Sequence, residues 1–252
     1  MYKFKFRGFT LAEVLITLGI IGVIAAITIP SLMAKLNQIK YRTKYVKTIS
    51  VLKQNLLQFD NDYGVNWGNV VRCWPNETNN SYKNPEDVTT RCGIFTYAMP
   101  KAQKIFPLTG SIGAFPFSTF NSYRFNKRCS VLCNGGYSVH TSFQNIYLLA
   151  DGILVAFGNG GYSNGEICSL NQGEPLTGEW IDQHRGCLGL IDINNFDKPN
   201  KEVSCTNAET STKVETPCVV SGDGLSDMFP VVFHDGTVEP ASNAAKYILN
   251  NK

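Results

Sequence analysis

An apolar run near the N-terminus constrains the fold of this chain more than any other feature. Residues 9–29 are twenty-one consecutive residues among which Glu13 is the only ionisable side chain. An α-helix needs about 20 such residues to cross a bilayer whose hydrocarbon core is about 30 Å thick. The run therefore predicts a membrane-spanning helix. Because a charge in lipid costs about 2.5 to 3.5 kcal/mol on insertion scales, we expect Glu13 to have a partner and a function.

The residues that flank this run do not fit a secretory signal peptide. A signal peptide has an apolar stretch of about 7 to 15 residues that ends in a small-residue cleavage site. Here the apolar stretch is longer, the basic octapeptide MYKFKFRG precedes it, and Pro30 follows it. Gly8 and Phe9 form the junction between the octapeptide and the run.

Together with Thr10, Leu11 and Glu13, this junction resembles the N-terminus of type IV prepilins and type II secretion pseudopilins. The resemblance covers roughly residues 1–50, and it implies that a prepilin peptidase cuts after Gly8 at the cytoplasmic face and methylates Phe9. It also implies that Glu13 pairs, in a filament, with the new amine of Phe9 on a neighbouring subunit. The alternative from position alone is a carboxylate that lies near the lipid headgroups of an ordinary single-span anchor.

The apolar period continues beyond Pro30 and predicts a long helix. Apolar residues recur mostly at steps of three or four, which is typical of one helix face. The segment DNDYG at residues 60–64 provides the natural end, so a helix from Phe9 would contain about 54 residues and extend about 80 Å. We expect Pro30 to kink this helix and the outer half to pack on the rest of the chain. The stripe consists of Leu32, Leu36, Ile39, Val46, Ile49, Leu52, Leu56 and Phe59.

Residues 63–252 are expected to form a β-rich head. Apolar runs flank Asp-Gly pairs at residues 145–157 and 229–240, which is a hairpin signature, and residues 186–193 indicate a further strand. A short helix with a polar N-cap is expected from Ser242 onward. The sequence therefore predicts an α+β fold in which an antiparallel sheet of four or more strands, with disulfide-tied loops, packs against the long helix. The resemblance implies the same arrangement, a pilin-like fold, with a leader peptide at 1–8, a transmembrane segment at 9–30, an extracytoplasmic amphipathic stem at 31–62 and a head at 63–252.

Eight cysteines, all beyond the apolar run, indicate disulfides. An even number of cysteines is typical of proteins in an oxidising compartment, and no cysteine or histidine has the spacing of a zinc site. We therefore expect the head outside the cytoplasm, although the basic residues after Pro30 favour the opposite orientation, because large domains translocate largely regardless of flanking charge. Many pairings are open to eight cysteines; we favour neighbours in sequence, Cys73–Cys92, Cys129–Cys133, Cys168–Cys187 and Cys205–Cys218.

Charge is segregated along the chain. Basic residues follow the apolar run with no acidic residue before Asp60, whereas the chain from Asp60 onward has 14 basic and 19 acidic residues. A basic stem thus precedes a mildly acidic head, which gives no argument for a nucleic-acid partner. The basic residues of the stem are Lys35, Lys40, Arg42, Lys44, Lys47 and Lys53.

One loop has the composition of a calcium site. Asp192, Asn194 and Asp197 lie close together, and Asp223 and Asp227 follow; carboxylate and amide oxygens are the ligands that Ca²⁺ takes. The spacing departs from the Asp-x-Asp-x-Asp-Gly pattern, and Asp and Asn are equally typical of turns. Calcium binding is one hypothesis and turn formation the other, and no other cofactor is expected.

Catalysis is not expected. His140, His184 and His234 lie in no recognisable motif. The segment GYSNG around Ser163 matches Gly-x-Ser-x-Gly, but it lacks the preceding apolar strand and the following helix that give this motif its meaning. We therefore predict that the chain is not an enzyme.

The resemblance implies a structural subunit of a type IV pilus-like or type II secretion pseudopilus filament. Such a subunit is anchored in the bacterial inner membrane by one span, with its head outside the cytoplasm, before it enters a filament or reaches the cell surface. The implied partners are a prepilin peptidase, other pilin or pseudopilin subunits, the inner-membrane assembly platform and membrane lipid, with no specific nucleic acid. Two alternatives stay open: a minor or tip subunit whose head binds a glycan or DNA, and a membrane-anchored domain that never polymerises. Pili, type II secretion and competence systems share this N-terminus, so it does not distinguish them.

Overall fold

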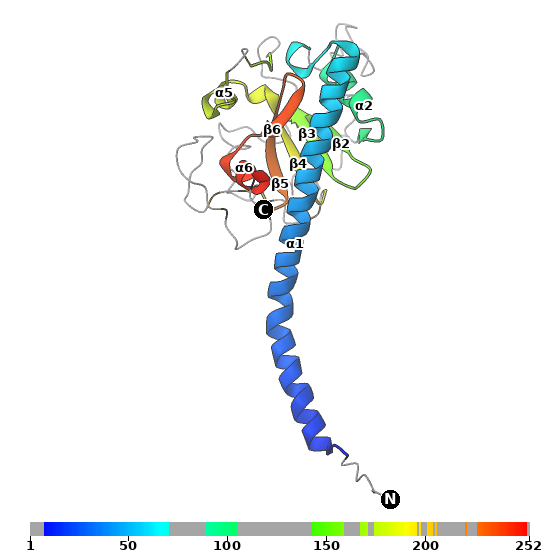
Figure 1. Ribbon diagram of the computed structural model, residues 1–252, viewed down its shortest axis with the longest axis vertical. Coiled ribbons are helices and arrows are strands. Elements are labelled where there is room, and N and C mark those ends of the chain that lie inside the picture. Colours follow the sequence, from blue (N-terminus) through cyan, green and yellow to red (C-terminus); the bar gives the residue numbers. More distant parts are fainter. Residues whose placement is uncertain are drawn as a thin grey trace, which may run out of the picture. The chain divides into compact units, whose positions relative to one another are not determined.

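The computed structural model describes residues 8–70, 89–104, 143–158, 167–170, 174–195, 197, 201–203, 205, 220 and 226–250. The chain divides into two compact units, Met1–Lys40 and Tyr41–Lys252. One helix, α1 (Leu11–Tyr63), contributes to both units, and the sheet belongs to the second (Figure 1). The long N-terminal helix and the β-rich head that the sequence predicts are confirmed, and the fold is α+β.

In the first unit, α1 is continuous through Pro30. Proline lacks an N–H and removes one backbone hydrogen bond from a helix. Hydroxyl groups on both sides of it bond to helix carbonyls: Thr28 Oγ1 donates to Ile24 O at 2.9 Å, and Ser31 Oγ donates to Thr28 O at 2.9 Å. Such bonds satisfy polar side chains where lipid offers no partner. Pro30 therefore does not end the helix, and the kink expected there stays a prediction.

In the second unit, one face of α1 is buried against the sheet. The ring of Tyr45 stacks on Phe229 of the sheet, with centroids 4.1 Å apart. Val46, a member of the apolar stripe, is half-buried. The reason is the helical period of 3.6 residues, which places Tyr45 rather than Val46 in line with Ile49 and Leu52. The buried residues of α1 are Tyr45, Thr48, Ile49, Leu52, Leu56 and Phe59.

The end of α1 lies where the sequence predicts it. Tyr63 is the last helical residue, and the N–H of Gly64 donates to Asp60 O at 2.7 Å. Gly64 has a φ of 66°, the left-handed conformation that often closes a helix and that glycine adopts without a Cβ penalty.

Six described strands form one sheet in the order β1-β2-β3-β4-β5-β6, and every neighbouring pair is antiparallel. Both predicted hairpins are confirmed, with Asp151–Gly152 in the turn between β2 and β3 and Asp235–Gly236 between β5 and β6. The strands are β1 (Gln103–Lys104), β2 (Phe143–Leu148), β3 (Leu154–Gly158), β4 (Leu188–Asp192), β5 (Met228–His234) and β6 (Thr237–Pro240).

The central strands β4 and β5 are buried along their whole length. On the face that contacts α1, the short 3₁₀ helix η1 (Trp67–Asn69) places Trp67 on Phe233, with centroids 4.7 Å apart, and on Phe157 at 4.8 Å. Helix α2 (Arg91–Ala98) adds Phe95, which lies 4.5 Å from Tyr147 of β2. Aromatic side chains of α1, η1 and α2 therefore cover this face of the sheet together. The sequence predicted α1 alone as the cover.

Four basic residues of α1, all in the second unit, contact other elements of the head. Arg42 Nε donates to Ile248 O of α6 (Asn243–Asn250) at 3.0 Å, a favourable place for a cation because carbonyls at a helix C-terminus carry negative partial charge. Lys44 Nζ lies 3.4 Å from Ile193 O. Two ion pairs join Lys47 to Asp151 at 3.5 Å and Lys53 to Glu239 at 3.7 Å. These four side chains therefore make contacts within one chain.

Disulfides tie the loops of the head. Cys168 and Cys187 are bonded, as predicted, and Cys187 ends the 3₁₀ helix η2 (Arg185–Cys187) that follows α5 (Gly178–Gln183). Cys92 and Cys205 are also disulfide-bonded. The predicted partners Cys73 and Cys218, and the predicted pair Cys129–Cys133, lie outside the described residues.

Candidate functional site at the N-terminus

The junction between Gly8 and Phe9 lies directly before α1 in a non-helical, exposed segment. The Phe9 side chain is 87% exposed. Apart from Gly8 and its two chain neighbours, no atom of the described residues lies within 4 Å of the position that a Cβ at Gly8 would occupy. Exposed, non-helical backbone is where proteases cut most readily, so the geometry is compatible with cleavage at this bond.

Glu13 and Thr10 form a reciprocal N-terminal cap on α1. Thr10 donates to Glu13 Oε2 twice, from its backbone N–H at 2.8 Å and from Oγ1 at 2.8 Å. In return, the N–H of Glu13 donates to Thr10 Oγ1 at 3.3 Å. This is a capping box, in which an N-cap Thr and an acid three residues later satisfy donors that the helix leaves without partners. The Thr-x-x-Glu pattern at residues 10–13 is the sequence signal for this cap.

The cap leaves part of Glu13 available. Both described bonds to its side chain use Oε2, and no described residue donates to Oε1. The structure places Gly8, Phe9 and Glu13 within the same short stretch, but no hydrogen bond among the described residues joins Phe9 to Glu13. Glu13 can therefore hold its own helix end and accept a further donor.

The helix that follows is long and apolar enough to cross a membrane. Among the described residues, α1 alone meets this criterion. Its apolar side chains are exposed within the first unit; the largest exposures, between 55% and 79%, include those of Leu11, Leu15, Ile16, Leu18, Val23 and Ile27. An apolar surface of this size usually marks a site that lipid or another protein covers. This is consistent with membrane anchoring.

The Asp-rich loop of the head is built as a turn. Asp192 is fully buried and accepts from the N–H of Asn194 at 3.2 Å, while Asn194 Nδ2 donates to Asp197 O at 3.0 Å. Asp227 is also buried and accepts from the N–H of Lys201 at 2.6 Å. Within the described ranges, no group of three or more His, Cys, Asp and Glu side chains is placed to hold a metal ion. Asp223 lies outside those ranges, so calcium binding stays a prediction.

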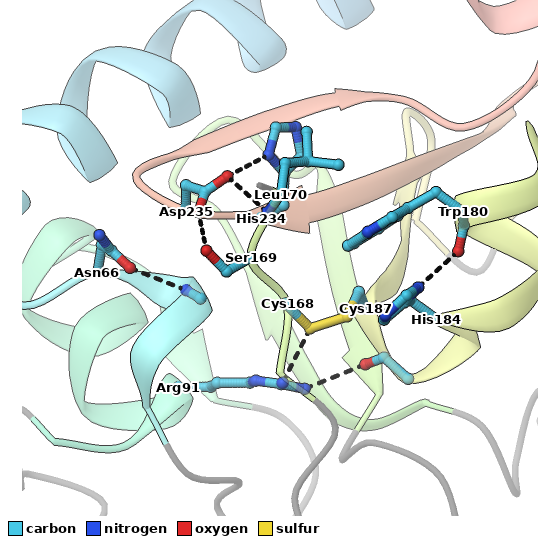
Figure 2. Close-up of a disulfide and its surroundings, with 12 residues drawn as sticks. Asn66, Arg91, Cys168, Ser169, Leu170, Trp180, His184, Cys187, His234 and Asp235 are labelled. Carbon is cyan, nitrogen blue, oxygen red and sulfur yellow. Dashed lines mark hydrogen bonds and ion pairs between the residues drawn. A yellow bond between two sulfur atoms is a disulfide. The ribbon is translucent and has the colours of Figure 1, made fainter. Parts of the chain in front are cut away.

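A second polar cluster surrounds Asp235 in the β5–β6 turn (Figure 2). Ser169 Oγ donates to Asp235 Oδ1 at 2.6 Å, and His234 Nδ1 and the N–H of Leu170 lie 3.0 and 3.3 Å from Oδ2. Burial raises the pKa of Asp235, but the bonds from His234, Ser169 and Leu170 together outweigh it and hold the pKa below its usual value. Ser169 and His234 bind the same carboxylate rather than each other, so the cluster does not have the geometry of a nucleophile and its base.

The cluster instead connects distant segments of the head. The N–H of Asp235 donates to Cys168 O at 2.9 Å, and the N–H of Trp67 donates to Asp235 O at 2.8 Å. Nearby, the buried Arg91 of α2 donates from Nη1 to Gly186 O at 3.1 Å, and its Nη2 lies 2.9 Å from Cys168 Sγ (Figure 2). His140 and Ser163 lie outside the described residues. These contacts hold η1, α2 and the disulfide against the sheet, a role for Arg91 and Asp235 that no sequence motif indicated.

Comparison with known proteins bears on the N-terminus only. Residues 3–29 match the family model of the prokaryotic N-terminal methylation motif. No curated protein and no solved structure matches the chain. The matched segment contains the Gly8–Phe9 junction, the Thr10–Glu13 cap and most of the apolar run. Residues 3–29 of the chain therefore carry the prokaryotic N-terminal methylation motif, which is the signature of type IV pilins and pseudopilins.

Proposed function

We propose that this chain is a structural subunit of a type IV pilus-like or type II secretion pseudopilus filament, processed after Gly8 and assembled through α1. The observation that carries the proposal is the arrangement of one short segment. An exposed Gly8–Phe9 bond lies directly before the capped first turn of an apolar helix, and the capping carboxylate belongs to Glu13.

Electrostatics explains why this arrangement suits assembly. Cleavage after Gly8 would place an ammonium on Phe9, at a helix end that already carries about half a positive elementary charge. Isolated charges are costly in lipid. The negative carboxylate of Glu13 offsets the positive charge at this end of the helix. Because Oε1 accepts no hydrogen bond from the described residues, Glu13 has an oxygen available for the ammonium of a neighbouring subunit. Such a pair would fix the axial register of adjacent helices.

This function requires a prepilin peptidase, an inner-membrane assembly platform and other subunits. The head would lie outside the cytoplasm, where its disulfides are stable. Mass spectrometry of the mature N-terminal peptide tests the processing step. We expect a peptide that starts at Phe9 and carries one added methyl group; a mature chain that starts at Met1 would refute the proposal.

The variant Gly8→Val provides a check on peptidase recognition. Because no described residue beyond its chain neighbours lies within 4 Å of a Cβ at Gly8, we expect a side chain there to leave the head folded, so that loss of cleavage would reflect recognition by the peptidase. We expect the uncleaved form to accumulate in the membrane with a normally folded head.

Two substitutions separate the charge of Glu13 from its cap. Glu13→Gln keeps an acceptor for Thr10, because Gln also serves in capping boxes, but removes the charge. Thr10→Ala removes the hydroxyl and keeps the charge. We expect Glu13→Gln to be cleaved normally yet to enter sheared, purified filaments at least tenfold less than the native chain, with a smaller loss for Thr10→Ala. Equal assembly of Glu13→Gln and the native chain would favour a membrane-anchored domain that does not polymerise.

A minor or tip subunit is the second candidate. The observation that favours it is a pair of neighbouring tyrosines on the head, Tyr63 and Tyr97, that are 53% and 47% exposed. Quantification in purified filaments separates the two roles, since a major subunit dominates the preparation and a minor one is scarce.

A further inference from the structure

A groove on the head lies between α1, the segment that follows α2 and the β2–β3 turn. Its volume is about 390 Å³, within the range of about 300 to 1,000 Å³ of sites that take small ligands. Val51 and Asn55 line it from α1, and Met99, Pro100 and Leu149 line it from the other two segments. The groove is open rather than enclosed, so it suits a ligand that lies along the surface.

Two exposed tyrosines, Tyr63 and Tyr97, lie near this groove and contact the same buried ring. Tyr63 in the last turn of α1 is 53% exposed, and Tyr97 in α2 is 47% exposed. Their ring centroids lie 6.1 Å apart with the planes inclined at 52°. Both rings pack against buried Phe59, at 4.6 Å for Tyr63 and 6.4 Å for Tyr97. Because regular helices and a buried ring hold them, these aromatic faces are oriented before any ligand binds.

The groove and the tyrosine pair adjoin one another along α1 and α2. Asn55 Nδ2 donates to Ala98 O at 2.9 Å and lies 3.1 Å from Met99 Sδ. Phe59 follows Asn55 by one helical turn, and Tyr97 directly precedes Ala98. From the start of the groove to Tyr63, α1 rises about 24 Å at 1.5 Å per residue. The combined surface, called here the groove–tyrosine surface, therefore suits an extended chain.

Charge along this surface argues against a polyanion. The groove contains Lys47 and Lys101, but Lys47 is paired with Asp151 at 3.5 Å. Asp62, in the last turn of α1 beside Tyr63, is also exposed. Proteins that track single-stranded nucleic acid combine stacking rings with a positively charged groove, and anionic membranes attract clusters of basic residues. Neither excess of positive charge is present among the described residues of this surface.

We propose that the groove–tyrosine surface binds an uncharged polysaccharide. Sugar rings have flat C–H faces that stack on aromatic side chains, and their hydroxyls bond to mixed amide, carboxylate and ammonium groups such as those of the rim. The proposal rests on the proposed function in one respect, that the head lies outside the cytoplasm, where such polymers occur. It deepens the candidate role of a minor or tip subunit by naming the ligand class.

Binding is tested with the full processed chain in detergent micelles. Uncharged oligosaccharides, namely cellohexaose, chitohexaose, mannohexaose and maltohexaose, are titrated by calorimetry and by tyrosine fluorescence, with an oligothymidylate of similar length as the polyanionic comparison. We expect at least one oligosaccharide to bind and the DNA not to bind. Binding of DNA in preference to every sugar, or binding of none of these probes, would overturn the proposal.

Variants locate the binding surface. Tyr63→Ala and Tyr97→Ala should each weaken binding about 5- to 150-fold, the factor expected for loss of one stacked ring. Tyr63→Phe, which keeps the ring, should bind within a few fold of the native chain. Tyr247→Ala serves as the matched control because Tyr247 is a 40% exposed tyrosine on α6. Native affinity in both alanine variants at 63 and 97 would refute the site.

The test of sugar binding is independent of filament assembly. Glu13→Gln should bind the oligosaccharide like the native chain, and Tyr97→Ala should assemble like the native chain. Failure of the sugar titration with normal assembly would overturn the binding site alone, and failure of assembly with normal sugar binding would overturn the proposed filament role alone.

Discussion

Substitution of Gly189 tests how the aromatic layer packs on the sheet. Gly189 of β4 faces the ring of Phe233 on the neighbouring strand β5. A Cβ added at this position would meet the ring at Cε2 and Cδ2, and would lie 2.9 Å from Ala156 O of β3. The ring has little room to move, because Phe233 is fully buried and stacks on Trp67 with centroids 4.7 Å apart.

The expected cost of Gly189→Ala follows from these contacts. Insertion of extra atoms into a well-packed core costs about 1 to 3 kcal/mol. Replacing glycine also restricts the conformations of the unfolded chain, which raises the free energy of unfolding by about 0.4 to 1 kcal/mol. The clash dominates because both a rigid ring and a backbone carbonyl oppose the new methyl group, so we expect a net loss of about 1 to 2 kcal/mol. For a domain of this size that is a fall in Tm of about 2 to 8 °C.

Thermal unfolding of the full chain in micelles, followed by near-ultraviolet circular dichroism, measures the effect on the head. Phe233→Leu supplies the matched control, since a smaller side chain makes room for the methyl group of Gly189→Ala. The loss of unfolding free energy in the double variant should be smaller than the sum of the two single losses. The difference should exceed about 0.5 kcal/mol, the limit within which the effects of independent sites add. An unchanged Tm for Gly189→Ala, or strict additivity in the cycle, would refute the reasoning.

Three further outcomes are expected. Thr10→Ala should speed amide exchange at the first turn of α1 about 2- to 30-fold, the factor for a lost cap of about 0.5 to 2 kcal/mol, and Thr10→Ser should not; hydrogen exchange of the mature chain in micelles checks this. Because the pKa of Asp235 is lowered in the folded state, its stabilising effect is present at neutral pH and is lost as the pH falls below about 4 and through the lowered pKa. Asp235→Asn, which keeps a residue suited to the positive φ of 44°, should therefore melt below the native chain at pH 7, with a gap that narrows in acid; a gap independent of pH contradicts this. Lys53→Ala should lower stability by no more than about 1 kcal/mol, because its pair with Glu239 at 3.7 Å is well exposed, and a larger loss by denaturant titration would show that the pair does more than geometry indicates.

Several elements were predictable because their causes lie within a few residues. The end of α1 follows from Gly64, which adopts the left-handed conformation directly after Tyr63. The two hairpins follow from Asp-Gly pairs between apolar runs. The Thr10–Glu13 cap is equally local, and its pattern was readable although it was not used. Within the outer half of the apolar stripe, Val46 is half-buried whereas Tyr45 is fully buried, because the exact face of α1 that meets the sheet depends on the packing partner as well as on the helix.

Sequence by itself determined the long apolar helix, its carboxylate and its methylation motif, since length, hydropathy and a short motif are properties of adjacent residues. Tertiary structure alone decided which groups meet across long separations. Arg91 reaches Gly186 across 95 residues, and Arg42 reaches Ile248 across 206. The same holds for the ring that covers Gly189 and for the groove that adjoins Tyr63 and Tyr97. These contacts depend on how the strands and helices pack in three dimensions, and no local pattern of residues encodes which distant partner a buried side chain will face.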